Sequence, residues 1–563
     1  MQTPNFTRAG WPVWAASGLI VVFLIAAFCE ARLKSPTSDE PPHIAAGLSY
    51  FVSHEVFRAN PQHPPLMKEL AALSLLTSGV RWPKTPDASY LVNGDDPARV
   101  WGLDWPVGVD LIARNGVDRV MRWARAPMIL IGALLGVILF LWGRQLFGPV
   151  AAVAAVLVWL LDPIVFAHSQ FVTTDVGSAA LGLLALYALW NYLLQPGWKR
   201  LIWTGLAFGA ALTAKFSAAF LLPIAGVLLL ASLRWPISAP PAKPASKKAP
   251  APRQYYRSIW VAGAVLGAAA FAVIQITYFF PDDAMMYLRC ARMVNADHNP
   301  DYLMFMAGSL SRNFPGYFGL AYLLKEPIAA IVLTGIGLAA ILRNQSLPVL
   351  AKWFILLPPA VFFLAVTFMA DNLGVRYIMP VLPFAHLFAG VGIANLVDRA
   401  RVSRPALAAV TVLCLWLTVA AIGIYPDQIS YFNEAACLLS EPGKTGLDGG
   451  TRCGTKWLDD SNVDWGQGFQ QLKTWLDRNA PSRPLNFAFT TQFPPEAYGI
   501  QCRHLQLEDL FKKPEPGIYV VSAHLVARGP AAARSVGKDA EWLRTTKPVA
   551  IVGHALYVYD IGR

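Results

Sequence analysis

The stretch "WPVWAASGLIVVFLIAAFCEARLKSPTSDEPPHIAAG", residues 11–47, joins an apolar run to a pair of adjacent carboxylates. Residues 11–29 contain no charged side chain. A helix of about 20 apolar residues is long enough to cross the roughly 30 Å hydrocarbon core of a bilayer. Asp39 and Glu40 follow shortly after this run. The stretch therefore predicts a membrane helix with two acids just beyond its end.

The rest of the chain repeats the apolar pattern. Of its 563 residues 55% are hydrophobic and only 15% are charged, and the mean hydropathy is +0.42, which is unlike a soluble globular protein. Periodicity and length predict eleven membrane spans, some of them short. These spans are 11–29, 127–143, 149–166, 177–195, 201–213, 217–233, 258–279, 327–342, 353–370, 377–396 and 405–424. The predicted fold class is a polytopic α-helical membrane protein.

Basic residues in the short connections predict the orientation, because cytoplasmic loops hold an excess of Lys and Arg. The connections near 198–200, 343–352 and 398–404 are basic, and the segment 234–257 has six basic residues and no acidic one. All of them fall on one side of the predicted membrane. We expect that side, with the N-terminus, to be the cytoplasm of a bacterium and the membrane to be its inner membrane. The net charge of +12 then reflects topology and not nucleic-acid binding.

The predicted transmembrane domain covers residues 1–424. The outward loop 30–126 is too long for a simple connector, and "HIAAGLSYFV" and "PPLMKELAALSLLTSG" in it predict two interfacial helices. The Pro-, Ala- and Lys-rich segment 234–257 predicts a disordered cytoplasmic linker whose basic residues meet anionic lipid.

Residues 425–563 are predicted to form an α/β domain outside the cytoplasm. The β-branched and aromatic runs 485–491, 517–526 and 549–561 predict strands, and 468–481 predicts a helix ended by Asn-Ala-Pro. Cys437 and Cys453 are the favoured disulfide pair, because a disulfide is allowed in this compartment.

The acidic pair is the first candidate for catalysis. A carboxylate such as Asp39 or Glu40 at the membrane boundary can act as a general base toward an attacking hydroxyl. The alternative is that both are ordinary exposed acids at a helix end. Their neighbours favour a site, since His43 lies four residues on. His63 and Lys68 follow in "NPQHPPLMKE", where the lysine is placed to hold a phosphate as a point charge.

Asp175, in "FAHSQFVTTDVGSAALG", lies at the outward mouth of the fourth predicted span. An ionisable residue at this position is a candidate functional group. It could instead, with Thr174, cap the helix that follows. Lys215 falls at an outward turn, where it could pair an acid, meet a phosphate or simply reach the interface.

Several further cations are predicted on the outward side. Lys325 precedes one predicted span, and Arg376 and Tyr377 begin another. Arginine is suited to bidentate phosphate binding. Together these groups point to an anionic lipid headgroup presented at the outer leaflet, although each alone could be an interfacial anchor.

The segment "LDDSNVDWGQGFQQL" combines Asp464 and Trp465 with other acids and amides. Polar groups beside an indole are typical of sugar binding, because the ring stacks on the sugar and the polar groups meet its hydroxyls. An Asx loop or a helix cap is the alternative. The pattern of a calcium-binding hand is missing, and no phosphate-binding glycine loop or zinc-protease helix occurs in the sequence.

These motifs in order resemble a known group of enzymes. The acidic pair, "HPPLMK", "TTD", the Lys-Glu-Pro helix opening and "GVRYIMP" are similar to the protein O-mannosyltransferase and lipid A aminoarabinose transferase group of GT-C glycosyltransferases. The resemblance covers roughly residues 11–400. The C-terminal part differs from the β-trefoil domain of eukaryotic mannosyltransferases, and eleven spans are fewer than expected of the aminoarabinose enzyme.

The resemblance implies an inverting enzyme that passes a sugar from a polyprenyl monophosphate donor to an extracytoplasmic acceptor. Asp39 would be the base, and Lys68 and Arg376 would bind the donor phosphate. Glu40 and His63 would shape the same pocket. We expect no cofactor and no obligatory metal, because Lys and Arg can stabilise a phosphate leaving group, although His43, His54 and His63 could ligate an ion. A secondary transporter and a non-catalytic polysaccharide assembly subunit are the alternatives.

Overall fold

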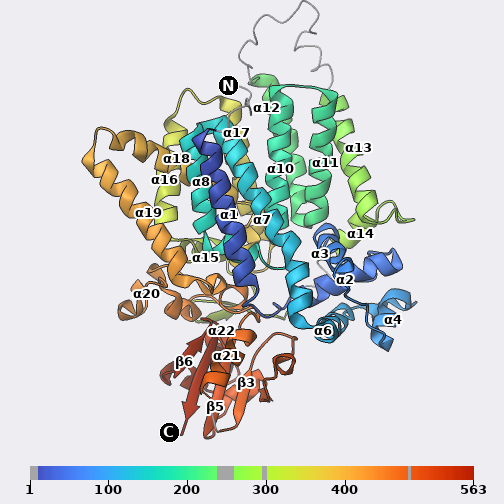
Figure 1. Ribbon diagram of the computed structural model, residues 1–563, viewed down its shortest axis with the longest axis vertical. Helices are drawn as coiled ribbons and strands as arrows, with labels where there is room; N and C mark the ends of the chain where they lie inside the picture. The colour runs from blue at the N-terminus through green and yellow to red at the C-terminus, as the bar shows by residue number, and fades with distance from the viewer. Residues whose placement is uncertain (1–9, 237–258, 295–300, 480–482, 563) are drawn as a thin grey trace, which may run out of the picture.

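The computed structural model describes residues 10–236, 259–294, 301–479 and 483–562. A body of long helices occupies one end of the molecule, and a small sheet domain that includes the C-terminus lies at the other (Figure 1). Most of the predicted basic linker, residues 237–257, lies outside the described residues.

Each of the eleven predicted spans contains a helix. They are α1 (Trp11–Ala31), α7 (Val117–Phe147), α8 (Pro149–Leu161), α10 (Asp175–Leu194), α11 (Trp198–Ala214), α12 (Leu221–Arg234), α13 (Ile259–Thr277), α16 (Ile328–Arg343), α17 (Val349–Met369), α18 (Leu382–Ala400) and α19 (Arg404–Ile424). Seven helical segments in the described residues are long and apolar enough to cross a membrane, or eight if α15 (Tyr317–Lys325) and α16, bent by 109°, form one span. The chain is a multi-pass helical membrane protein, as predicted.

Small residues let the helices approach closely. A Cβ added to Gly337 of α16 would lie only 1.7 Å from the carbonyl oxygen of Phe388 in α18. A Cβ on Gly209 of α11 would meet Val273 of α13 at 2.6 Å. Small residues at such crossings are typical of helix packing in membranes, where van der Waals contact and not water drives association.

The long loop after α1, predicted to face outward, folds into short helices beside the ends of α7 and α13 (Figure 1). They are α2 (Glu40–Ser53), α3 (Leu66–Leu76), α4 (Pro86–Asn93), α5 (Pro97–Val100) and α6 (Asp104–Asn115). Gly47 on α2 packs against the backbone of Lys68 on α3, and Gly108 on α6 packs against the backbone of Pro41. The acidic pair therefore begins a helix that is fixed from two sides.

The C-terminal domain contains a mixed five-stranded sheet in the order β4-β3-β5-β7-β6, which confirms the predicted α/β class. The strands are β3 (Leu485–Ala488), β4 (Arg503–Leu505), β5 (Gly517–Ser522), β6 (Ala550–Val552) and β7 (Leu556–Ile561). β3 runs parallel to β4 and β5, with Asn486 opposite Arg503 and Tyr519, whereas β7 is antiparallel to β5 and β6. The helices α21 (Phe469–Asn479) and α22 (Ala523–Ser535) accompany the sheet.

The three strand predictions in this domain need correction. The run 485–491 is a strand only to Ala488. The run 517–526 is a strand only to Ser522, whose hydroxyl then accepts a hydrogen bond from His524 N and starts α22. The run 549–561 is a hairpin, because Gly553 and His554 adopt positive φ angles of 59° and 53° and reverse the chain.

Shorter elements lie between the membrane helices and within the C-terminal part of the chain. They are α9 (Pro163–His168), η1 (Phe216–Phe220), α14 (Met286–Met293), β1 (Met304–Met306), β2 (Ser309–Ser311), η3 (Val375–Ile378), η4 (Gln428–Ser430), α20 (Ala435–Leu438), η5 (Pro442–Lys444), η6 (Thr451–Lys456), η7 (Asp460–Asn462), η8 (Pro495–Tyr498), η9 (Leu507–Phe511) and α23 (Trp542–Thr545). Cys437 and Cys453 are joined by a disulfide, as predicted.

Candidate active site

The centre of the candidate site is a guanidinium that faces two carboxylates. Arg376 on η3 donates a hydrogen bond of 2.8 Å from Nη1 to Oδ2 of Asp39, the residue before α2. The same nitrogen lies 3.7 Å from Oδ2 of Asp175, the first residue of α10. Asp175 is buried, whereas the side chains of Arg376 and Asp39 remain 13% and 24% exposed. Three predicted site residues from distant parts of the chain therefore meet at one end of the helices.

Lys215 completes a cluster of two acids and two cations. It follows α11, and its ammonium donates to Oδ1 of Asp175 at 2.5 Å. Of the alternatives left open by the sequence, the structure therefore shows Lys215 paired with an acid. The ammonium also lies 5.0 Å from the ring centroid of Tyr377, the neighbour of Arg376. Thr174 occupies the cap position of α10, but the carboxylate of Asp175 serves the ion pairs instead of the helix end.

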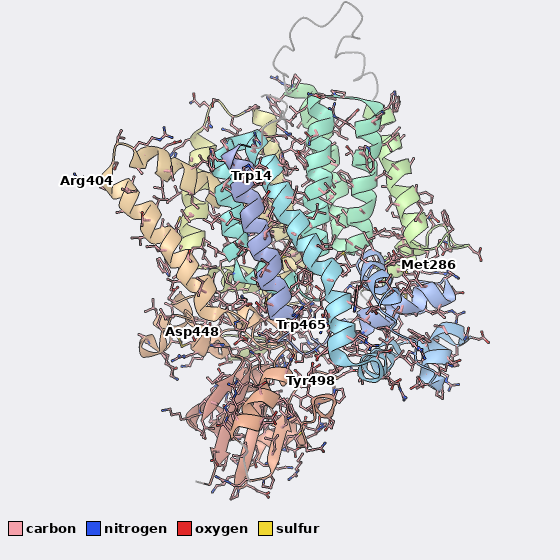
Figure 2. The ribbon with its side chains drawn as sticks, in the orientation of Figure 1. Trp14, Met286, Arg404, Asp448, Trp465 and Tyr498 are labelled. Carbon is pink, nitrogen blue, oxygen red and sulfur yellow. A yellow bond between two sulfur atoms is a disulfide. The ribbon has the colours of Figure 1, made fainter. Side chains whose placement is uncertain are left out.

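An indole lies against Arg376 on the side of the C-terminal domain. The guanidinium carbon of Arg376 is 4.2 Å from the ring centroid of Trp465, and Trp465 also packs against His168 and Phe171. Figure 2 shows Trp465 at the boundary between the helical body and the sheet domain. Trp465 is only 5% exposed, so in this conformation its ring supports the arginine and is not open to stack on a sugar.

Asp460, one of the other acids of the segment that was predicted to bind sugar, lies near the same cluster. Its φ of 54° is unusual for a residue other than glycine. Its backbone N–H donates to Nδ1 of His524 at 2.8 Å. Burial raises the pKa of Asp460, and the charge of Arg376 opposes that rise. The neighbouring Asp459 instead pairs with Arg528 at 2.9 Å.

Glu40, the second member of the predicted acidic pair, has a different environment from Asp39. It is fully buried, and its two oxygens accept hydrogen bonds from Arg125, from Val172 N, and from the backbone and hydroxyl of Thr37. Arg125 in turn donates to three carbonyl oxygens between Ala31 and Ser35. With both oxygens occupied, Glu40 is placed to hold the chain around Asp39 and not to accept a substrate proton.

Lys68 was expected to face the acidic cluster, but its ammonium is bonded elsewhere. It is fully buried, and its ammonium donates to the carbonyl oxygens of Asn60 and His63, both at 2.7 Å, and to Oδ1 of Asn60 at 3.2 Å. Burial lowers the pKa of Lys68 to about 7. Its protons stabilise the loop that precedes α3, so the arrangement does not offer this lysine to a donor phosphate.

Lys325 is likewise committed elsewhere. Its buried ammonium donates to the carbonyl oxygens of Ile429 and Asn462, both at 2.6 Å, and lies 4.4 Å from the ring centroid of Phe432. It therefore fastens α15 to the segment that begins the C-terminal domain. The side-chain oxygen of Asn462 also accepts from Val375 N, next to Arg376. Lys325 thus helps to position Arg376 through Asn462 and does not itself face the cluster.

The two predicted histidines lie beside the acidic cluster. Nδ1 of His43 is 2.8 Å from the carbonyl oxygen of Val172, and the rings of His43 and His63 meet edge to face at 5.2 Å. Burial lowers the pKa of both histidines, and the charges of Lys68 and Lys215 lower that of His63 further. Two neutral imidazoles therefore line this side of the site.

Asp464 forms an Asx turn, which the sequence left open as the alternative to sugar binding. Its Oδ1 accepts from Gly466 N at 2.9 Å, which is an Asx turn, and its Oδ2 accepts from the hydroxyl of Ser522. Burial raises its pKa to about 6. Asp464 shapes the loop that carries Trp465, and its contacts leave no carboxylate oxygen open to a sugar.

Comparison with known protein families gives a match over part of the chain. Residues 116–241 match the family model described as dolichyl-phosphate-mannose-protein mannosyltransferase. The matched segment includes Asp175 and Lys215 and covers less than half of the chain. It confirms the resemblance to this group of glycosyltransferases that the motifs predicted. No curated protein sequence matches the chain.

The chain is similar to a number of solved structures, and two of them illustrate the likeness. One is ArnT from Cupriavidus metallidurans bound to undecaprenyl phosphate, with 14% identity and a TM-score of 0.43 over 98% of this chain and 99% of that chain. The other is the archaeal oligosaccharyltransferase AglB from Archaeoglobus fulgidus in complex with an inhibitory peptide and a dolichol-phosphate, with 10% identity and a TM-score of 0.46 over 93% of this chain and 72% of that chain.

Proposed function

We propose that the chain is an inverting glycosyltransferase that moves a sugar from a polyprenyl-phosphate donor to an acceptor outside the cytoplasm. The observation that carries the proposal is Arg376 between Asp39 and Asp175, with Lys215 beside them at the ends of membrane helices. The family match over residues 116–241 supports the transfer of a glycosyl group. The proposed acceptor is a lipid, a glycan or a protein.

The charges of the cluster suggest how a donor enters. Two carboxylates and two cations are formally neutral together, so an arriving phosphate has to compete with Asp39 and Asp175 for Arg376 and Lys215. Arginine is the better partner for a phosphate, because its planar fork can make two parallel hydrogen bonds. Rotation of Arg376 toward the phosphate would break its contact with Asp39. Donor binding would then release the carboxylate in the presence of the sugar.

Asp39 is the proposed general base. It is the more exposed acid of the cluster, and an acceptor hydroxyl can approach it from outside. The hydroxyl oxygen attacks the anomeric carbon, its proton passes to the carboxylate of Asp39, and the bond to the phosphate oxygen breaks. Arg376 and Lys215 stabilise the negative charge on the departing phosphate. Attack from the face opposite the leaving group inverts the anomeric carbon.

The position of the cluster favours a transferase over a transporter. Asp175 begins α10, Lys215 follows the end of α11, and Arg376 precedes α18. A secondary transporter places its ionisable groups near the middle of the bilayer. Charges at the helix ends instead suit a lipid phosphate held at the membrane surface. With the N-terminus in the cytoplasm of a bacterium, this surface would be the outer face of the inner membrane.

The test is release of polyprenyl phosphate by the purified protein. A panel of polyprenyl-phosphate hexoses and pentoses is offered with membrane extract as the source of acceptor. We expect one donor to turn over with the unaltered chain and a loss of about 10²-fold or more in Asp39→Asn. The matched control is Asp398→Asn, an exposed acid whose side chain is 72% accessible and which lies near the C-terminal end of α18, away from Arg376.

Three results are informative. Turnover that disappears only in Asp39→Asn supports both the activity and the base. Equal turnover in both variants would show that the base lies elsewhere, with Asp175 the next carboxylate to replace. Folded protein that releases no polyprenyl phosphate from any donor would contradict the proposed function and favour a transport or assembly role.

A further inference from the structure

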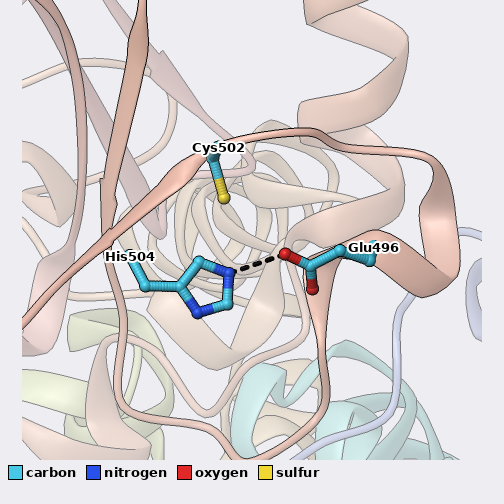
Figure 3. A group of neighbouring side chains, drawn as sticks. All are labelled: Glu496, Cys502 and His504. Carbon is cyan, nitrogen blue, oxygen red and sulfur yellow. Dashed lines mark hydrogen bonds and ion pairs between the residues drawn. The ribbon is translucent and has the colours of Figure 1, made fainter.

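A second cluster of chemically active side chains lies in the C-terminal domain, apart from the candidate active site. Glu496, Cys502 and His504 each offer one ligand atom, and these three atoms all lie within 4.8 Å of one another. Nε2 of His504 is 2.7 Å from Oε1 of Glu496. Figure 3 shows the sulfur of Cys502 directed toward the same space.

The three side chains come from a compact piece of chain that the fold holds in place. Glu496 is on η8, and Gly499, with a φ of 72°, then reverses the chain. Ile500 is buried in the core of the domain, which brings Cys502 back beside Glu496. His504 lies on β4 in register with Phe487 of β3. The ligand atoms are thus brought together by backbone geometry.

The imidazole of His504 is also oriented by packing. Its ring meets that of Phe489 edge to face at 5.2 Å, and Phe489 packs against Phe469 and Phe487 of the domain core. A ligand whose ring is fixed in advance loses little freedom when it binds an ion. The side chains of His504 and Glu496 are 44% and 42% exposed, so an ion can enter from solvent.

The chemistry of the three groups selects a class of ion. A thiolate, an imidazole and a carboxylate together suit Zn²⁺ or a similar borderline-soft divalent metal, and not Ca²⁺ or Mg²⁺, which prefer oxygen. Zinc bond lengths of about 2.0 to 2.3 Å put tetrahedral ligand atoms roughly 3.3 to 3.8 Å apart. To reach this spacing, the atoms of His504 and Glu496 that now lie 2.7 Å apart would separate, and the sulfur, now within 4.8 Å of both, would lie no more than about 3.8 Å from them.

The free thiol is otherwise without an explanation. Burial, together with the charge of Glu496, raises the pKa of Cys502 to about 11. A disulfide elsewhere in the same part of the chain indicates an oxidising compartment, in which a partly exposed free thiol is open to oxidation. A bound cation would attract both the thiolate of Cys502 and the carboxylate of Glu496, which otherwise repel each other. Coordination to the cation would also protect the sulfur from oxidation.

We propose that Glu496, Cys502 and His504 form a zinc site with three protein ligands and one position open to water. On binding, the thiol of Cys502 loses its proton to solvent and its sulfur bonds to the ion. The proton between Nε2 of His504 and Glu496 leaves this position through solvent, so that the neutral imidazole carries its proton on Nδ1, and Nε2 and the carboxylate oxygen each bond to the metal. This site is separate from the cluster around Asp39, so it makes no statement about a metal in the transfer reaction.

The position of the loop suggests what the ion would fix. Tyr498, two residues after Glu496, lines a cavity of about 230 Å³. The C-terminal end of α1 and the N-terminal part of α7 line the same cavity, with Arg32 and Arg122 among their residues. Figure 2 shows Tyr498 below the helical body. Because η8 carries both Glu496 and Tyr498, an ion on Glu496 would hold this contact between the sheet domain and the helices.

The experiment measures metal directly on the full-length purified protein. The chain is stripped with a chelator, exposed to Zn²⁺, freed of excess ion and analysed for metal content. A parallel sample loaded with Co²⁺ is examined for the near-ultraviolet absorption of a thiolate–cobalt bond. We expect one zinc per chain and a cobalt–thiolate band in the unaltered protein.

Variants separate the proposed ligands from other thiols and acids. Cys502→Ser should lose the cobalt–thiolate band, and His504→Gln and Glu496→Gln should weaken zinc binding by about tenfold or more. Cys29→Ser removes an exposed thiol on α1 and should change neither result. Size-exclusion profiles check that each variant is folded. The proposal is overturned if the unaltered chain retains no zinc, or if Cys502→Ser keeps the band.

Discussion

Arg376 donates a hydrogen bond to Asp39 across 337 residues of sequence. The pair joins the residue before α2 to η3, which precedes α18. Asp175 lies on the other side of the same guanidinium nitrogen. A cation between two carboxylates has a choice of partners, and in the proposed reaction a phosphate becomes the third.

The geometry of this arginine should matter as well as its charge. We expect Arg376→Lys to lower kcat for release of polyprenyl phosphate by about 10²-fold to 10³-fold, because an ammonium cannot reproduce the bidentate fork toward a phosphate. Steady-state kinetics with the active donor measures the loss. The control is Arg343→Lys, which changes an exposed residue at the C-terminal end of α16 and should leave the turnover of the donor normal. Full activity of Arg376→Lys would show that a point charge is sufficient.

Lys215 and Asp175 should behave as a coupled pair. A hydrogen bond to a charged group contributes about 1.5 to 3 kcal/mol, so Lys215→Met should lower kcat/KM for the donor about tenfold to a hundredfold. Its loss also leaves Asp175 with Arg376 alone, 3.7 Å away. The exposed Lys199, changed to Met, serves as the control.

A double-mutant cycle tests the coupling of this pair. If the ammonium acts through Asp175, the losses of Lys215→Met and Asp175→Asn will not add in the double variant. Additive losses would mean that the two residues contribute separately to donor binding.

Glu40 and Arg125 should contribute to stability more than to chemistry. Glu40→Gln leaves the buried guanidinium of Arg125 without its ionic partner, which we expect to lower the free energy of unfolding by about 3 to 5 kcal/mol. Denaturant unfolding in mixed micelles measures the change. The double variant Glu40→Gln with Arg125→Met should recover part of the loss. A Glu40→Gln protein as stable as the unaltered chain but without turnover would instead identify Glu40 as a catalytic group.

The membrane helices could be predicted from the sequence because each apolar run carries its own evidence. Length and hydrophobicity are local properties, and α1 and α19 match their predicted spans within a few residues. The same reasoning found the strand at 517–522, but it ran past Ser522, because a cap signal was hidden in an apolar run.

The roles of the charged residues could not be predicted in the same way. Lys68, Lys215 and Lys325 all looked like cations at a membrane boundary. Only Lys215 meets a carboxylate of the cluster, whereas the other two donate to loop carbonyls. Whether a carbonyl or an acid lies within reach of an ammonium depends on how distant helices pack, and no local pattern encodes it. Arg125 was missed for the same reason, since its partner Glu40 is 85 residues away.

A histidine with two acidic partners lies at the contact between the helices and the sheet domain. His554, in the turn between β6 and β7, lies 2.9 Å from Asp427 and 3.4 Å from Asp448. Asp427 is also paired with Lys34, just after α1. Burial alone would lower the pKa of His554, but the hydrogen bonds and charges of Asp427 and Asp448 outweigh it and raise the pKa from 6.5 to about 9. Folding thus favours the protonated imidazole.

The sign of the pH dependence follows from that shift. A group whose pKa is higher in the folded state contributes fully below its unfolded pKa, here 6.5, and its contribution disappears as the pH rises through about 9. Other groups titrate in the same range, so the comparison is between the unaltered chain and His554→Asn at each pH. Asparagine tolerates the positive φ of this turn. The difference in thermal unfolding temperature should be largest at pH 6.5 and below, decrease as the pH rises toward 9, and vanish above pH 9.

His54→Asn provides the matched control, since His54 is exposed and has a similar φ of 58°. Its unfolding temperature should follow that of the unaltered chain across the whole range. A difference between His554→Asn and the unaltered chain that stays constant with pH would show that the imidazole acts by packing alone. A difference that decreases through this interval instead assigns the protonated histidine, held by Asp427 and Asp448, a share in fastening the sheet domain to the helices that carry the candidate site.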